Sequence, residues 1–119
     1  MARVRPQRAA TIRRGDVVWV ALDPTIGSEI QKTRPAIVVS NDAMNRFGQR
    51  MIVVPVTSNV DNCFPGEALV TIKGKPNRAL GDQMRSVDKT RLRGRLDRLS
   101  HAETEAVDQA LIVSLALER

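Results

Sequence analysis

The chain alternates between short apolar runs and turn-forming residues, and this pattern constrains its fold more than any other feature. Each run is rich in Val, Ile and Ala and is bounded by Gly, Pro, Asn or Asp, which is typical of β-strands. We predict strands at residues 16–22, 35–40, 50–58 and 67–72, one or two more within 79–92, and a last extended piece at 94–99. Segment 41–49 is expected to form a turn or short helix, and 73–78 a turn. Pro55 cannot donate a ladder hydrogen bond, so a bulge or an edge position is expected there.

The end of the chain predicts one helix. Ser100 and Glu103 have the spacing of a capping box, in which two side chains satisfy backbone donors that a helix start leaves open. Apolar residues follow at helical spacing, so we expect a C-terminal helix of about eighteen residues. Several short strands closed by one helix predict a mainly β fold, a small β-barrel with a helix packed on it. We assign residues 14–119 to this single domain and residues 1–13 to a flexible basic arm.

Composition limits the class of protein. With 119 residues, of which 42% are hydrophobic, the chain has a globular composition. Cys63 is the only cysteine, which excludes an intramolecular disulfide and a cysteine-rich metal site and fits a reducing compartment. No apolar run reaches the roughly eighteen residues of a membrane helix, and no apolar signal core follows the basic N-terminus. We therefore expect a cytoplasmic protein that makes no contact with membrane.

Positive charge is concentrated in two parts of the sequence. Residues 1–14 carry five arginines and no acidic residue, and residues 73–98 carry nine Lys and Arg against three Asp and Glu, a net charge of +6. The first part is either a solvated extension or a binding element. The second part lies within the predicted domain, where it indicates a basic face that attracts polyanions.

Side chains for several kinds of chemistry are missing from the sequence. His101 is the only histidine and is expected on the helix surface, which excludes a histidine pair for acid–base catalysis and a His/Cys zinc site. No Walker A or GxGxxG phosphate loop occurs. The aromatic residues are Trp19, Phe47 and Phe64, too few for an extended base-stacking platform. No metal and no other cofactor is expected.

Two polar residues at predicted strand ends remain as candidates for a site. Arg34 stands before Pro35, which favours an extended conformation for the residue that precedes it. Such an arginine closes a turn, pairs with a carboxylate or binds an anion. Thr57 ends the third predicted strand and is either an ordinary β-branched strand residue or a hydroxyl placed for function. If the two strands are neighbours, both side chains emerge at related ends of the sheet.

Taken together, these segments resemble the MazF/PemK toxins of bacterial toxin–antitoxin systems. The matching stretches are RRGDVVWVALDPTIGSEIQKTRPAIVVSNDAMNRF, IVVPVTSN and DQMRSVDKTRL, and the similarity continues into the C-terminal DQALIVSLAL. No single piece suffices, but the combination is specific. The resemblance implies an SH3-like barrel of the PemK/CcdB type, a homodimer, and a metal-independent endoribonuclease that cuts single-stranded RNA at particular sequences.

The resemblance also implies roles for individual residues. Arg34 and Thr57 match the family's catalytic arginine and threonine. Other matches fall in segments that contact RNA, namely Ser28, Glu29, Gln31, Lys32, Asn45, Arg46, Ser58, Gln83 and Arg85. Ile30 and Gln31 stand where some members have two glycines, so loop flexibility and base preference do not transfer.

In the implied mechanism the RNA supplies its own nucleophile. The 2′-hydroxyl attacks the neighbouring phosphorus, which leaves a 2′,3′-cyclic phosphate and a 5′-hydroxyl end. Arg34 stabilises the charge that grows on the phosphorane oxygens, and Thr57 donates a hydrogen bond to the phosphate or positions the 2′-hydroxyl. DNA lacks the attacking group and is not cut.

The implied inhibitor is a cognate acidic, MazE-like antitoxin, and DNA is reached only indirectly, through the antitoxin complex. Two other hypotheses stay open at this point. One is a CcdB-like toxin that binds gyrase without nuclease activity, because fold alone does not separate the two functions. The other is a barrel that binds RNA without cutting it.

Overall fold

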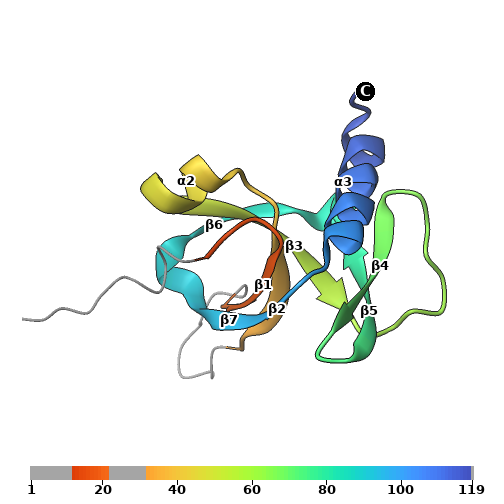
Figure 1. Ribbon diagram of the computed structural model, residues 1–119, viewed down its shortest axis with the longest axis horizontal. Helices are drawn as coiled ribbons and strands as arrows, with labels where there is room; N and C mark the ends of the chain where they lie inside the picture. The colour runs from red at the N-terminus through yellow and green to blue at the C-terminus, as the bar shows by residue number, and fades with distance from the viewer. Residues whose placement is uncertain (1–11, 22–31, 119) are drawn as a thin grey trace, which may run out of the picture.

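The computed structural model describes residues 12–21 and 32–118 (Figure 1). In chain order the elements are β1 (Asp16–Val20), β2 (Arg34–Val38), α2 (Asp42–Phe47), β3 (Arg50–Thr57), β4 (Glu67–Ile72), β5 (Lys75–Leu80), the 3₁₀ turn η1 (Gly81–Gln83), β6 (Arg85–Asp88), the 3₁₀ turn η2 (Lys89–Arg91), β7 (Leu92–Arg98) and α3 (His101–Leu115). The described strands form one curled sheet in the order β4-β5-β3-β2-β1-β7, and β6 also pairs with β3. The predicted mainly β fold with a C-terminal helix is confirmed. Neither described helix is long and apolar enough to cross a membrane.

The curled sheet separates two apolar layers. Successive side chains of a strand point to opposite faces, so Val17 of β1 joins one layer and Val18 the other, and both are fully buried. The inner layer fills the inside of the curl and consists of Ile12, Val18, Val20, Ala36, Val38, Met51, Val53 and Val87. The outer layer lies between the sheet and α3 and consists of Val17, Ile37, Val54, Ala68, Val70, Ile72, Ala79, Leu99, Val107 and Ala110.

The predicted turn at residues 73–78 is wrong from Lys75 onwards. Only Lys73 and Gly74 form the turn between β4 and β5, and both have positive φ, 50° and 77°. A two-residue hairpin turn with positive φ at both positions matches the twist of the paired strands. The polar residues that follow therefore belong to β5. The predicted segment 41–49, in contrast, contains the short helix α2.

Pro55 lies inside the sheet, so the predicted edge position is wrong. On one side β3 pairs with β2 in regular register, with Pro55 opposite Ala36. On the other side β3 pairs with β6 as far as Val53 and with β5 from Val56 onwards. The missing N–H of proline thus falls where β3 changes partner, and an internal strand tolerates it there.

Helix α3 begins with the predicted capping box. The Ser100 hydroxyl accepts a hydrogen bond from the Glu103 N–H at 3.1 Å, and the Glu103 carboxylate accepts one from the Ser100 N–H at 3.0 Å. Burial raises the pKa of Glu103, but hydrogen bonds from the N–H groups of Ser100 and Thr71 outweigh it and leave the pKa below its usual value. The helix has 15 residues, fewer than predicted, because Ala116 adopts a left-handed conformation and ends it.

The packed domain begins before residue 14. Ile12, which the sequence placed in the arm, is only 6% exposed and belongs to the inner layer. The N–H of Arg13 donates to Asp16 Oδ2 at 2.8 Å. Asp16 is fully buried and also binds the guanidinium of Arg98, with Arg95 Nη1 at 3.6 Å. This carboxylate therefore joins the segment before β1 to β7. The rest of the predicted arm lies outside the described residues.

Replacing Asp16 by asparagine is expected to lower the free energy of unfolding by about 2–3 kcal/mol, since a buried ion pair loses one charge while its arginines remain. Urea unfolding monitored by circular dichroism measures the change. Asp61→Asn, an equal charge change at an exposed loop residue, is the control and should change the value by less than about 0.5 kcal/mol. Equal, small decreases in the free energy of unfolding of both variants would contradict a structural role for the Asp16 carboxylate.

Candidate functional site

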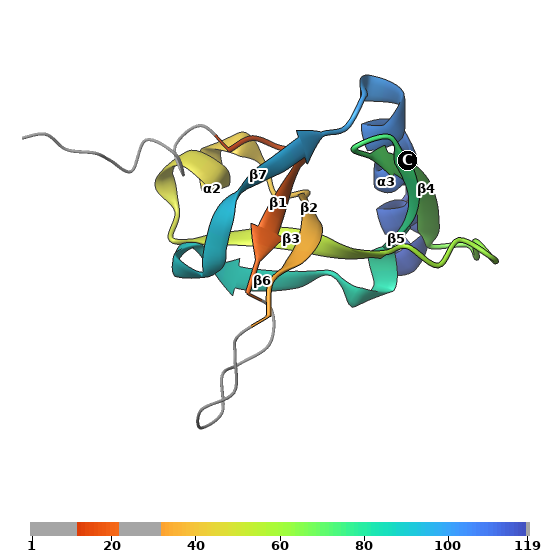
Figure 2. The same ribbon diagram turned by 90° about the horizontal axis from the view of Figure 1, so that it is seen from below.

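Arg34 and Thr57 lie where two paired strands separate. The pairing of β2 with β3 ends at Ala36 and Pro55. Beyond that pair β2 stays with β1, and β3 turns to β5, a divergence that is visible in Figures 1 and 2. Arg34 and Thr57 each stand two residues past the last shared pair, on the same face of the sheet as Ala36 and Pro55. The two side chains therefore flank the opening between the strands.

This opening adjoins the inner apolar layer. Ala36, fully buried, belongs to that layer, whereas Arg34 is exposed and Thr57 is half-buried. The extended conformation predicted for Arg34 is confirmed, because this residue begins β2 and pairs with Val20 of β1. The pairing of Arg34 with β1 and the restricted backbone of Pro35, the next residue, fix the backbone that carries the guanidinium.

The hydroxyl of Thr57 is held by a local hydrogen bond. Its Oγ1 accepts the N–H of Asn59 at 3.2 Å. A hydroxyl has one donor and two acceptor sites, so the O–H of Thr57 is still available to donate. A guanidinium and a hydroxyl donor on the two sides of one opening suit an anion such as a phosphate group.

Other predicted site residues approach the same region. Arg85 begins β6 opposite Val53 of β3 and is exposed, and Gln83 precedes it in η1. Ser58 follows Thr57 directly, and Lys32 precedes β2; both are exposed. The predicted residues Ser28, Glu29 and Gln31 lie outside the described residues.

Asn45 and Arg46 are not brought together with this group. They belong to α2, which precedes the start of β3, whereas Thr57 ends that strand (Figure 1). The amide of Asn45 donates to the Ser40 carbonyl at 2.9 Å and to Asp42 Oδ1 at 3.1 Å, and its oxygen accepts from the Ser40 hydroxyl. With 1% of its surface exposed, the Asn45 side chain joins α2 to the chain that leaves β2 and is not presented at the opening between β2 and β3.

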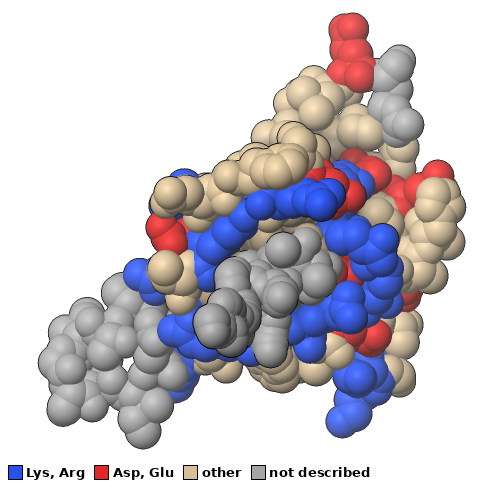
Figure 3. Space-filling model, turned by 60° about the vertical axis from the view of Figure 1, so that its left-hand side comes forward, with Lys and Arg blue, Asp and Glu red and all other residues tan. Residues whose placement is uncertain are grey.

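The surface around the curl is basic. Figure 3 shows Lys and Arg side chains gathered on the side of the molecule that lies to the left in Figure 1. The exposed cations of β2, β6 and β7 are Arg34, Arg85, Arg93, Arg95 and Arg98. Hydrogen bonds from the N–H groups of Lys73 and Arg98 lower the pKa of Asp97, and the N–H of Thr90 lowers that of Asp88. Both carboxylates are therefore ionised at neutral pH, yet the cations outnumber them.

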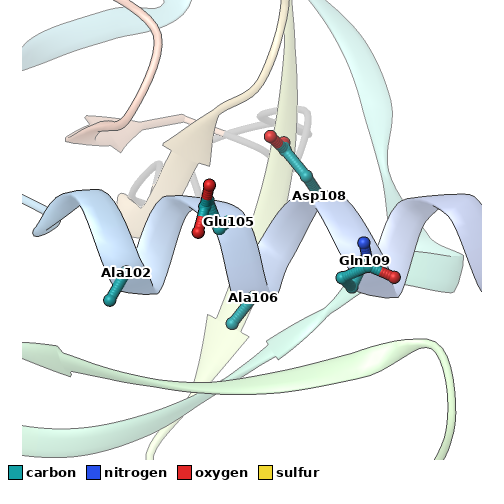
Figure 4. A pocket seen from close by; sticks show the side chains of 5 residues that line it. All are labelled: Ala102, Glu105, Ala106, Asp108 and Gln109. Carbon is teal, nitrogen blue, oxygen red and sulfur yellow. The ribbon is translucent and has the colours of Figure 1, made fainter.

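A separate hollow of about 420 Å³ lies on the surface of α3 (Figure 4). Its lining comes from this one helix and consists of Ala102, Glu105, Ala106, Asp108 and Gln109. Asp108 is paired with Arg14 at 2.5 Å. None of the predicted site residues borders this hollow, which is part of the helix surface. Among the described residues, no three His, Cys, Asp or Glu side chains lie close enough together to hold a metal ion.

The chain matches known proteins over most of its length. The family model of the PemK-like, MazF-like toxin of type II toxin–antitoxin systems matches residues 13–115. Endoribonuclease MazF9 of Mycobacterium tuberculosis is 42% identical over 115 residues, which covers 89% of this chain and 98% of that protein. Endoribonuclease EndoA of Bacillus subtilis is 34% identical over 111 residues, which covers 89% and 96%.

Solved structures agree with these sequence matches. The MazE–MazF complex of Deinococcus radiodurans contains a chain that is 29% identical to this one, with a TM-score of 0.74 and coverage of 90% of this chain and 97% of that chain. The strand ends that carry Arg34 and Thr57 lie within the matched residues. The chain belongs to the family of PemK-like, MazF-like toxins of type II toxin–antitoxin systems.

Proposed function

We propose that this protein is a sequence-specific endoribonuclease toxin that cuts single-stranded RNA in the cytoplasm and is neutralised by a cognate antitoxin. The observation that carries the proposal is the position of Arg34 and Thr57 on the two sides of the opening between β2 and β3, beside a basic surface. A guanidinium and a hydroxyl at one opening suit stabilisation of a charged phosphate during cleavage. The relatives named as endoribonucleases support the same activity.

The RNA contributes the nucleophile in the proposed reaction. The 2′-oxygen forms a bond to the adjacent phosphorus as its proton leaves, and the bond from phosphorus to the 5′-oxygen breaks as that oxygen gains a proton. Arg34 contacts non-bridging phosphate oxygens through two N–H groups and stabilises their growing charge. Thr57 donates its O–H to the same phosphate while the N–H of Asn59 holds its oxygen. The products are a 2′,3′-cyclic phosphate and a 5′-hydroxyl end.

Cleavage is expected to continue in EDTA without added divalent ions, because alignment and charge stabilisation come from the protein's own side chains. A long single-stranded RNA is incubated with the purified protein, and the product ends are mapped and tested for cyclic phosphate. Arg34→Ala protein, purified identically, controls for contaminating nucleases.

A strict requirement for Mg²⁺ or Mn²⁺ would contradict this metal-independent mechanism. Binding of RNA without cleavage would instead identify a plain RNA-binding barrel. Inhibition of gyrase without cleavage would identify a CcdB-like toxin.

We also propose that a second copy of the chain covers the apolar end of α3. Leu115 and Leu117 are 47% and 54% exposed, and both line a hollow that Arg14, Asp108, Leu111 and Ile112 complete. Contiguous exposed apolar side chains mark surfaces that bind another protein. A homodimer formed here would bury them and bring two basic faces into one particle.

The antitoxin is expected to block RNA by competition. An acidic, disordered C-terminal segment, encoded by the neighbouring antitoxin gene, would fold onto the basic surface and occupy the RNA site. This segment alone should raise the apparent KM for RNA and leave kcat unchanged, and inhibition should weaken as salt rises. A peptide with Asn and Gln in place of its acidic residues is the control. Lower kcat at unchanged KM, with RNA still bound, would mean separate sites.

A further inference from the structure

The loop of residues 58–66 follows Thr57 and precedes β4. Hydrogen bonds hold it at both ends. At its start Asn59 donates its N–H to Thr57 Oγ1 at 3.2 Å, and the N–H of Asp61 donates to Asn59 Oδ1 at 3.1 Å. At its end the N–H of Phe64 donates to Glu67 Oε1 at 3.1 Å, and the Phe64 carbonyl accepts the N–H of Glu67 at 2.9 Å. This exposed loop therefore has a fixed course that starts at the candidate catalytic hydroxyl.

Arg78 fixes the middle of this loop. Arg78 lies on β5 directly opposite Thr57, so the two side chains share one face of the sheet. Its Nη1 donates to the carbonyl of Asn62, and its Nε lies 3.6 Å from Glu67 Oε1. The side chains of Arg78 and Glu67 are 16% and 14% exposed. The Arg78 side chain leaves the sheet on the same face as Thr57 and ends at the carbonyl of Asn62 in the loop. The loop therefore passes over that face, beside Thr57.

A contribution to stability does not by itself explain why Arg78 and Glu67 form an ion pair here. Arg78 Nε is buried and has no hydrogen-bond partner, although the Glu67 carboxylate lies near it. Replacing a buried ion pair by apolar residues of similar size often leaves a protein as stable or makes it more stable. What an apolar pair cannot do is hold Asn62 through its carbonyl and Phe64 through its N–H.

We propose that Arg78 is a positioning residue for RNA recognition. Together with Glu67 it holds the loop 58–66 against the face that carries Thr57, and this loop contacts the nucleotide next to the bond that is cut. Exposed Asn59 and Asn62 carry amides that hydrogen-bond to base edges, and Phe64, 57% exposed, offers a ring on which a base stacks. The proposal rests on the proposed endoribonuclease function and adds to it a determinant of sequence preference.

The test compares Arg78→Met with Lys75→Met. Both variants remove one positive charge from β5, but Lys75 is exposed and forms no tie to the loop. Each protein cuts a long RNA of random sequence, and all cut sites are mapped. Measured quantities are kcat/KM for the preferred sequence and for the same sequence with the flanking nucleotide changed, the salt dependence of kcat/KM, and the midpoint of thermal unfolding.

The preference is the ratio of kcat/KM for the preferred RNA to kcat/KM for the changed RNA. Arg78→Met is expected to reduce this ratio at least tenfold and to leave the salt dependence of kcat/KM unchanged. Arg78→Lys should recover little of this preference, because an ammonium does not reproduce the fork of a guanidinium. Glu67→Gln should reduce the preference as well, and Lys75→Met should leave it intact. Glu67→Gln also serves as the test if Arg78→Met fails to fold.

Two results would overturn the proposal. A lower unfolding temperature with unchanged sequence preference would show a purely structural role. An equal loss of kcat/KM for both RNAs, with the slope of log kcat/KM against log salt concentration smaller by about one, would show that Arg78 contacts a phosphate directly. Failure of the unmodified protein to cut RNA would instead contradict the proposed function itself, which keeps the two hypotheses distinguishable.

Discussion

Arg34→Ala is expected to lower kcat/KM for RNA cleavage by about 10³-fold, the effect of removing a donor that stabilises a developing oxyanion. Arg34 is exposed at the start of β2 and belongs to neither apolar layer. Fold and oligomeric state should therefore be unchanged, as circular dichroism and size-exclusion chromatography would show. Activity is measured on a short RNA that contains one mapped cut site.

Arg34→Lys distinguishes geometry from charge. Lysine keeps the positive charge but offers a single ammonium in place of two parallel N–H groups, so the variant should remain impaired by about 10²-fold. Lys75→Ala is the matched control, because it removes an exposed cation of β5 that is not one of the predicted site residues. Near-normal turnover of Arg34→Lys at equal folded concentration would contradict a bidentate contact with the phosphate.

Features with local signals were predictable from the sequence. The segment 67–72 is a short run of mainly apolar and β-branched residues after Pro65-Gly66, and β4 has those bounds. Ser100 and Glu103 predict the start of α3 because a capping box involves only residues of the first turn. Pro35 restricts the residue before it, which is why the extended conformation of Arg34 could be predicted.

Features that depend on pairing or burial were not predictable. β5 reads Lys-Pro-Asn-Arg-Ala-Leu, with little strand signal, and becomes a strand through its pairing with β4. Arg78 was consequently assigned to a turn, and its position opposite Thr57 was missed. Asn45 lies in a segment that resembles the family, but its burial depends on the geometry of α2, in which its amide donates to the Ser40 carbonyl and to Asp42 Oδ1.

The role of Thr57 depends on whether its hydroxyl or only its branched shape is used. Thr57→Val keeps the shape and the strand preference but removes the hydroxyl, and it is expected to lower kcat/KM by about 10²-fold, as should Thr57→Ala. Thr57→Ser keeps the hydroxyl and an acceptor for the N–H of Asn59, so it should stay within about tenfold of the unmodified protein.

Thr71→Val, at an exposed position of β4, controls for the loss of a strand hydroxyl away from the opening and should leave kcat/KM unchanged. Thermal unfolding of each variant separates loss of activity from loss of fold, because valine at a strand position should not destabilise the sheet. The diagnostic comparison is therefore valine against serine at position 57. If Thr57→Val cuts RNA as fast as Thr57→Ser, the hydroxyl takes no part in the reaction and Thr57 only completes β3.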